Sequence, residues 1–455
     1  MYKEHIRVNY PHHVYIFWTK IKDILYYIET TNSILSSIRG QICHQFGNHK
    51  FNIMKRTHYT MSIMNNAYPN NRPTDMESVL NTVETAMDFL NSNLGRKPKA
   101  AHLMVRCLIQ WYTPDKWKML YQRSTKPKYN QRTLFFQLVL NRAWCAVDYL
   151  ILQCTQVMQH LDFPRLVNTP DKTGTIPLML IVSEQHGNEE IASTILRNAH
   201  RFVYPLQQDH RGITLLHYCL IRSSGTELSR QMLRLLQRRR PDSEHEQRLI
   251  SDALCSTVWK SRTDATKILI ESNVLHNFNI PDKRHCTPLM YAAYKGMIDI
   301  SNLLIQRGAI YTYQDNHDRT SLGSAIAGGQ GDVVTMLLER HRDDGVTEEL
   351  LKSDNMGRTP LMLMCSTGMV EQTKLLLELV GKHSDYINEQ TIGGQTALYY
   401  AAAEGNKELC ELLLSRGATA NADSRGIGPI RAAKDKEFDE LAEYIEEQVK
   451  PPVVA

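Results

Sequence analysis

The chain has 455 residues, of which 42% are hydrophobic and 22% charged, enough for one large core or a long array of small ones. Its formal charge of +5 lies in residues 1–60, where eight Lys and Arg face three acidic residues, and the rest is balanced. Because this body has no basic excess, we expect no nucleic-acid partner. The nine cysteines are odd in number, scattered and never in a C-x-x-C pair. This argues against a disulfide framework and favours a reducing compartment.

Residues 1–74 are predicted to be a basic N-terminal extension without a clear pattern, and Met61 or Met64 could also start translation. The apolar run at 14–18 is short and is followed by charged residues. It therefore predicts neither a signal peptide nor membrane insertion. We expect a cytoplasmic protein, with the nucleus as the alternative. Residues 75–130 are predicted to form N-terminal helices or a degenerate repeat.

One four-residue phrase recurs with an initial threonine, and a fixed period of this kind decides the fold. The copies are Thr287–Met290, Thr320–Gly323, Thr359–Met362 and Thr396–Tyr399, at steps of 33, 39 and 37 residues. A turn rich in Asp, Asn and Gly precedes each copy, and small residues and then an apolar run follow it. Weaker copies stand at Thr214–His217, Ile176–Met179 and Thr133–Phe136.

The chemistry of one unit can be derived from its residues. Asp and Gly form the turn, and the threonine hydroxyl caps a first helix. Proline suits the first helical position, where no N–H partner is needed. Paired alanines allow a neighbouring helix to pack closely, and the leucines form the apolar stripe of a second helix. A single unit cannot bury both faces, so the units must stack.

These residues resemble the ankyrin-repeat family, whose unit of about 33 residues is a turn followed by two helices. The resemblance implies an all-α repeat solenoid of stacked helix-turn-helix units with short β-turn hairpins. It predicts degenerate repeats over 131–278, well-formed repeats with a C-terminal cap over 279–448, and a tail over 449–455. A copy without its turn is expected between Thr214 and Thr287. Insertions predict longer loops at 238–246 and 340–349.

Four strings resemble chemical motifs, and each has a simpler interpretation. Asp171–Thr175 resembles the phosphorylated aspartate of P-type pumps but occupies a repeat turn. The string at 341–343 resembles a kinase catalytic loop without its metal-binding Asn, and the glycines at 328–331 lack the Lys of a phosphate loop. Cys43, His44 and His49 have no second ligand pair at a suitable spacing. We expect no catalytic residue, no metal and no cofactor.

The resemblance implies binding of other proteins through turn tips and the inner face of the first helices. The candidate contact residues are Lys283, Arg284, Tyr291, Tyr294, Asn316, His317, Asn355, Met356 and Tyr400. Exposed Tyr and Arg are common interface hot spots. The predicted function is a non-catalytic scaffold or adaptor. Two alternatives are a transcription-linked nuclear regulator, based on the three arginines at 238–240, and an enzyme with its catalytic part in residues 1–130.

Overall fold

The computed structural model divides the chain into two compact units, residues 1–119 and 120–455. It describes residues 86–88, 90–91, 101–102, 104–105, 122–125, 127–157, 163–183, 188–198, 203–222, 226–345, 350–381 and 385–449. The predicted extension at 1–74 lies outside these residues. In the first unit the described residues are helical, and Ala86, Met87 and Leu90 are buried.

The described part of the second unit is helical. Its helices are α6 (Leu134–Leu140), α7 (Trp144–Val157), α8 (Phe163–Asn168), α9 (Pro177–Ile181), α10 (Glu189–Asn198), α11 (Leu215–His217), α12 (Thr226–Arg239), α13 (Glu244–Trp259), α14 (Thr263–Glu271), α15 (Pro288–Tyr294), α16 (Ile298–Gln306), α17 (Ser321–Ala327), α18 (Gly331–Asp343), α19 (Pro360–Thr367), α20 (Val370–Val380), α21 (Ala397–Ala403), α22 (Lys407–Ser415), α23 (Pro429–Lys434) and α24 (Asp439–Val449), with short helices η1 (Pro127–Tyr129), η3 (Tyr218–Arg222) and η5 (Tyr386–Asn388).

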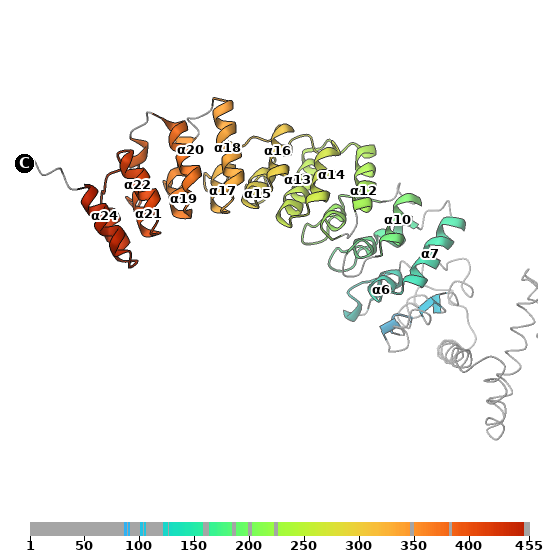
Figure 1. Ribbon diagram of the computed structural model, residues 1–455. Coiled ribbons are helices and arrows are strands. Elements are labelled where there is room, and N and C mark those ends of the chain that lie inside the picture. Colours follow the sequence, from blue (N-terminus) through green and yellow to red (C-terminus); the bar gives the residue numbers. More distant parts are fainter. Residues whose placement is uncertain are drawn as a thin grey trace, which may run out of the picture. The chain divides into compact units, whose positions relative to one another are not determined.

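The helices of the second unit stack in two rows (Figure 1). The first helices of successive repeats, from α13 to α23, contact one another in order, and the second helices, from α12 to α24, form a parallel row. In the described residues there is no strand, and the β-pairing consists of two isolated bridges, Arg123 with Thr133 and Gln208 with Thr214. The predicted all-α repeat solenoid is therefore confirmed. In the part of the chain that is described, no helix is both long and apolar enough for a bilayer crossing.

The threonine of each phrase caps its helix as predicted. The hydroxyls of Thr287, Thr320, Thr359 and Thr396 each accept the backbone N–H three residues later, all at 3.3 Å. Each cap residue has an extended backbone, which directs its oxygen at the unpaired amides of the first turn. The repeated phrase thus determines where each first helix begins.

Small residues form the contacts between repeats. Ala292, Ala293, Ala401 and Ala402 are fully buried, and so is Cys365. The second helices contribute leucines to the same core, which runs without a break from Ala293 to Ile445. The last helix, α24, buries Leu441, Ala442 and Ile445 and leaves its acidic residues exposed or half-buried. This distribution is what a terminal capping repeat requires.

The two predicted insertion loops are partly helical, because residues 238–239 end α12, residues 244–246 begin α13 and residues 340–343 end α18. Residues 346–349 lie outside the described ranges. Helix α18 runs to Asp343, and His341 is 3% exposed with its ring edge-on to Tyr311 at 4.8 Å. His341 continues the buried stripe of Val334 and Leu337 at helical spacing, so the apolar face lasts one turn longer. Likewise α12 runs to Arg239.

Candidate partner-binding surface

The repeat turns are held by their first residue. In six turns an aspartate Oδ1 accepts two backbone N–H groups, from the residues two and four positions later. For Asp315 the donors are His317 at 2.8 Å and Arg319 at 3.0 Å. At the seventh turn the Thr391 hydroxyl accepts one N–H, from Gln395. The aspartate carboxylates therefore stabilise the backbone conformation of their own turns.

Most turn carboxylates are also paired with an arginine. The second oxygens of Asp209, Asp315, Asp354 and Asp423 bind Arg211, Arg319, Arg358 and Arg425 at 2.7–2.8 Å. Burial alone would raise the pKa of Asp315, but hydrogen bonds from Arg319 and from backbone amides bring it below its usual value. These four arginines therefore form ion pairs within their own turns.

The turn at 282–286 departs from this arrangement. Its Asp282 Oδ2 accepts a hydrogen bond from the Tyr291 hydroxyl at 2.7 Å. Burial and this bond raise the pKa of Tyr291. Cys286 stands where Arg319 and Arg358 stand in their turns. Arg284, at the position of Arg211 and Arg425, makes no ion pair with any residue that the structure describes, and its side chain is exposed.

Neighbouring turns are joined by a ladder of backbone hydrogen bonds. The amides of Asn355, Ile392 and Ser424 donate to carbonyls of the preceding turns, at 3.0, 3.1 and 3.0 Å. Between the turns at 282–286 and 315–319, both within the described residues, the equivalent bond from Asn316 to Arg284 is absent. We refer to this position as the missing rung.

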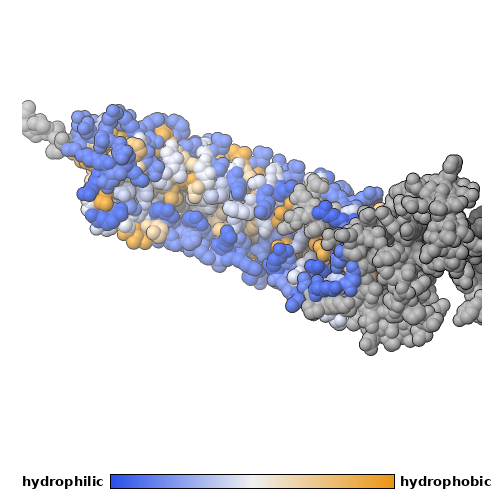
Figure 2. Space-filling model, turned by 90° about the horizontal axis from the view of Figure 1, so that it is seen from below, coloured by the Kyte–Doolittle hydropathy of each residue, from blue (hydrophilic) through white to orange (hydrophobic). Residues whose placement is uncertain are grey.

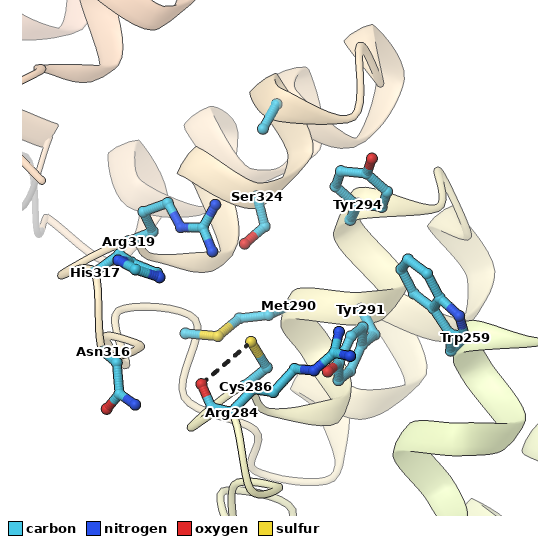
Figure 3. A pocket seen from close by; sticks show the side chains of 11 residues that line it. Trp259, Arg284, Cys286, Met290, Tyr291, Tyr294, Asn316, His317, Arg319 and Ser324 are labelled. Carbon is cyan, nitrogen blue, oxygen red and sulfur yellow. Dashed lines mark hydrogen bonds between the residues drawn. The ribbon is translucent and has the colours of Figure 1, made fainter.

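A pocket of 490 Å³ opens at the missing rung (Figure 3). Its lining residues are Trp259, Arg284, Cys286, Met290, Tyr291, Tyr294, Asn316, His317, Arg319, Ser324 and Ala327. They come from α13, α15, α17 and the two flanking turns. In Figure 3, Arg284, Met290 and Tyr291 stand on one side, Asn316, His317 and Arg319 on another, and Trp259 and Tyr294 at the far end.

The far end of the pocket is aromatic. The Trp259 ring stacks on Tyr294, with centroids 6.0 Å apart, and meets Tyr291 edge-on at 5.6 Å. The ammonium of Lys295 lies 4.2 Å from the Trp259 ring centroid, a cation–π contact. Trp259 and Tyr294 nevertheless remain 42% and 41% exposed. We call Trp259, Tyr291 and Tyr294 the aromatic cluster.

The structure brings five of the nine predicted contact residues together in this pocket. They are Arg284, Tyr291, Tyr294, Asn316 and His317. Tyr291, predicted as a surface contact, is half-buried because its hydroxyl also supports the turn.

The other four predicted residues lie elsewhere. Lys283 and Asn355 are exposed at turn tips, and Met356 is 55% exposed. Tyr400 is half-buried on α21, where its hydroxyl donates to Gln395 at 3.0 Å.

Sequence reasoning missed several exposed apolar residues, among them Trp259 and Ile392. Trp259 ends α13, a first helix of 16 residues in the repeat that lacks its turn phrase. Ile392 is 77% exposed at a turn tip, where its amide donates to the carbonyl of Met356. Trp259 has no repeat motif to mark it, although a lone aromatic at a charged helix end was a usable signal. Ile392 stands at the turn position of Asn316 and Asn355, so the turn itself could have identified it. The face seen in Figure 2 is mainly hydrophilic, with small separate hydrophobic patches.

The strings at 171–175 and 328–331, which resemble catalytic and phosphate-binding motifs, lie at turns of the repeats. The Oδ1 of Asp171 accepts from the amides of Thr173 and Thr175, and its Oδ2 lies 3.4 Å from Arg132. Gly328 and Gly329 lie in the turn between α17 and α18, and Gly331 begins α18. Within the described ranges, no group of His, Cys, Asp and Glu could hold a metal. Cys43, His44 and His49 lie outside them.

Paired helices, capped at a repeated threonine and joined by aspartate-supported turns, define a helical repeat protein. Residues 254–348 and 342–424 match a family model described as ankyrin repeats (3 copies). Residues 254–424 are therefore ankyrin repeats.

Similar proteins share a limited part of their length with this chain. A Caenorhabditis elegans homolog of transient receptor potential cation channel subfamily A member 1 is 30% identical over 36% of this chain and 13% of its own length. Protein glp-1 of the same organism is 28% identical over 37% of this chain and 13% of its own. An L-asparaginase of Dirofilaria immitis is 28% identical over 47% of this chain and 35% of its own. The chain thus spans at most about a third of these relatives.

Proposed function

We propose that the chain is a non-catalytic binding module for other proteins, used as a scaffold or adaptor. Ankyrin repeats generally mediate protein–protein interaction. The exposed rings of Trp259 and Tyr294 beside an open pocket are the observation that carries the proposal. Tyr and Trp are enriched at interface hot spots because they combine a large apolar area with a polar group. In Figure 1 the first helices, from which this cluster projects, lie on the inner side of the arc formed by the array.

The chemistry of the pocket supports binding without catalysis. Its thiol, Cys286, has a pKa raised by burial and by the negative charge of Asp282, so it is a poor nucleophile. The nearby carboxylates of Asp282 and Asp315 are engaged by Tyr291 and Arg319. The partial similarity to an asparaginase covers 35% of that protein and does not transfer its activity.

A cytoplasmic location remains part of this proposal. Of the three arginines that suggested a nuclear role, Arg238 and Arg239 end α12 and Arg240 follows it. The Arg239 guanidinium lies 4.9 Å from the ring centroid of Tyr204. Localisation of the tagged full chain tests this point, because exclusive nuclear accumulation would contradict it.

Site-specific photo-cross-linking tests the binding function. A photoreactive phenylalanine analogue replaces Tyr294 in the full chain expressed in its native cells. The matched control places the same analogue at Glu411, an exposed position on α22 in the second row of helices. We expect a discrete protein adduct from position 294 that is absent from position 411. The adduct should also weaken when Trp259→Ala is added. No adduct at 294, or equal adducts at both positions, would overturn the proposal.

A further inference from the structure

The pocket carries positive charge that the fold does not neutralise. Every other described arginine at the equivalent turn positions is paired with the aspartate of its own turn, but Arg284 is not. Its own Asp282 is occupied by Tyr291, at 2.7 Å. Lys283 is exposed beside it. A guanidinium on a pocket wall that has lost its intramolecular carboxylate is well suited to a carboxylate from outside.

The same pocket offers apolar surface next to this charge. Met290, Ala327 and the aromatic cluster line it together with Arg284, and its volume of 490 Å³ falls in the range of about 300–1,000 Å³ usual for ligand pockets. A small anion would leave this apolar wall unused. A cationic ligand would be repelled by Arg284 and by Lys295, which already covers the Trp259 ring.

The missing rung adds backbone groups to the same opening. In the turns at 354, 391 and 423, the second residue donates its amide to the preceding turn. The corresponding amide, on Asn316, has no acceptor among the described residues, and Asn316 is exposed. An extended peptide can use such an amide, because its carbonyls repeat along the chain.

We propose that the pocket at the missing rung binds an extended acidic peptide segment of a partner protein. In this assignment, which rests on the proposed binding function, an Asp or Glu of the peptide pairs with Arg284. A neighbouring apolar side chain of the peptide packs between Met290 and the aromatic cluster. Charge complementarity determines the occupant, because the pocket supplies the cation and the partner must supply the anion.

A displayed library of random 12-residue peptides, selected against the purified full chain, tests this assignment. We expect the selected peptides to be enriched in Asp and Glu next to an apolar residue. Their affinity should fall at least tenfold in Arg284→Gln and decrease with added salt. The matched control is Arg416→Gln, which neutralises an exposed arginine at the end of α22 and should leave binding unchanged. The charge-reversed Arg284→Glu should instead prefer the same peptides with Lys in place of the acidic residue.

The outcomes separate this inference from the proposed function. Peptides that lose affinity in Trp259→Ala but not in Arg284→Gln would overturn the acidic assignment and leave the binding surface standing. Selected peptides without acidic enrichment would do the same. Peptides unaffected by either variant, or a selection without any binder, would contradict both. A second copy of the chain as occupant would appear as Arg284-dependent dimerisation and would also overturn the assignment.

Discussion

Gly328 lies directly against the carbonyl oxygen of Tyr294, so that a Cβ at position 328 would stand 2.2 Å from that oxygen. The backbone after α17 therefore holds the end of α15, from which the Tyr294 side chain projects. We expect Gly328→Ala to reduce the free energy of unfolding by about 1–3 kcal/mol, because the added methyl forces two backbones apart. Urea unfolding of the full chain measures the change.

Gly323→Ala is the control for this substitution. Gly323 lies within α17, the helix that Gly328 follows, and its added Cβ would meet the Arg319 Cβ at 3.8 Å, an ordinary contact. Alanine inside a helix should stabilise it by up to about 1 kcal/mol relative to glycine. If both variants unfold at the same urea concentration, the close contact with Tyr294 has no energetic consequence.

Tyr291→Phe should destabilise the array, because it removes the hydroxyl that donates to the half-buried Asp282. We expect a loss of about 1–3 kcal/mol in the free energy of unfolding. Tyr294→Phe is the matched control, since its exposed hydroxyl has no hydrogen-bond partner in the described residues. Its change should stay within about 0.5 kcal/mol. Equal effects of the two variants in chemical denaturation would show that the Asp282 contact is not structural.

His217 should make the stability depend on pH. Burial lowers its pKa from 6.5 to about 4, against opposing effects of the Asp252 backbone and the Asp209 charge. Between these two values only the unfolded chain binds the proton. Stability is therefore complete above about pH 6.5 and falls as the pH is lowered. At pH 5 the loss from this group should reach about 2 kcal/mol.

His217→Met removes this titration and keeps the cap. Methionine already fills this role in another repeat, where the Met290 sulfur accepts a hydrogen bond from the Thr287 amide at 3.4 Å. The variant should lose about 2 kcal/mol less than the wild type between pH 7 and pH 5. An identical decrease in the urea midpoint of both proteins would contradict the assignment to His217.

Asp171→Asn tests whether the pump-like string has any chemistry. The carboxylate is buried and supports its turn, so the substitution should lower the melting temperature. Both proteins should hydrolyse ATP at the background rate and form no acyl-phosphate. ATP hydrolysis by the wild type that disappears in a folded Asp171→Asn protein would show that the string is catalytic.

The sequence was sufficient to predict the repeats, because caps and turns are local. Thr287 and Thr359 cap their helices from within the same four residues, and Asp315 forms its turn within five. The pocket depends on contacts between repeats, which no local pattern encodes. Arg211 and Arg284 occupy equivalent turn positions, yet Arg211 pairs with its own aspartate and Arg284 does not.

The aromatic cluster shows the same limit. Trp259 belongs to the repeat without a turn phrase, and the stack with Tyr294 joins residues of two different repeats. The candidate contact residues were predicted from their positions relative to the repeated phrase. Trp259 lies in a repeat without that phrase, so this criterion did not find it.

The missing rung also has a mechanical consequence. From the turn at 315 to the turn at 423, the row of turns acts as a second spine beside the helices, because each backbone bond resists the parting of two repeats. Between the turns at 282–286 and 315–319 this spine is interrupted, and the packing of α15 against α17 carries the joint. In a repeat array each unit touches only its neighbours, so the close packing of these two first helices holds the repeats together where the turn bond is absent. A segment bound in the pocket would contact residues of both turns and so add a second connection between these two repeats.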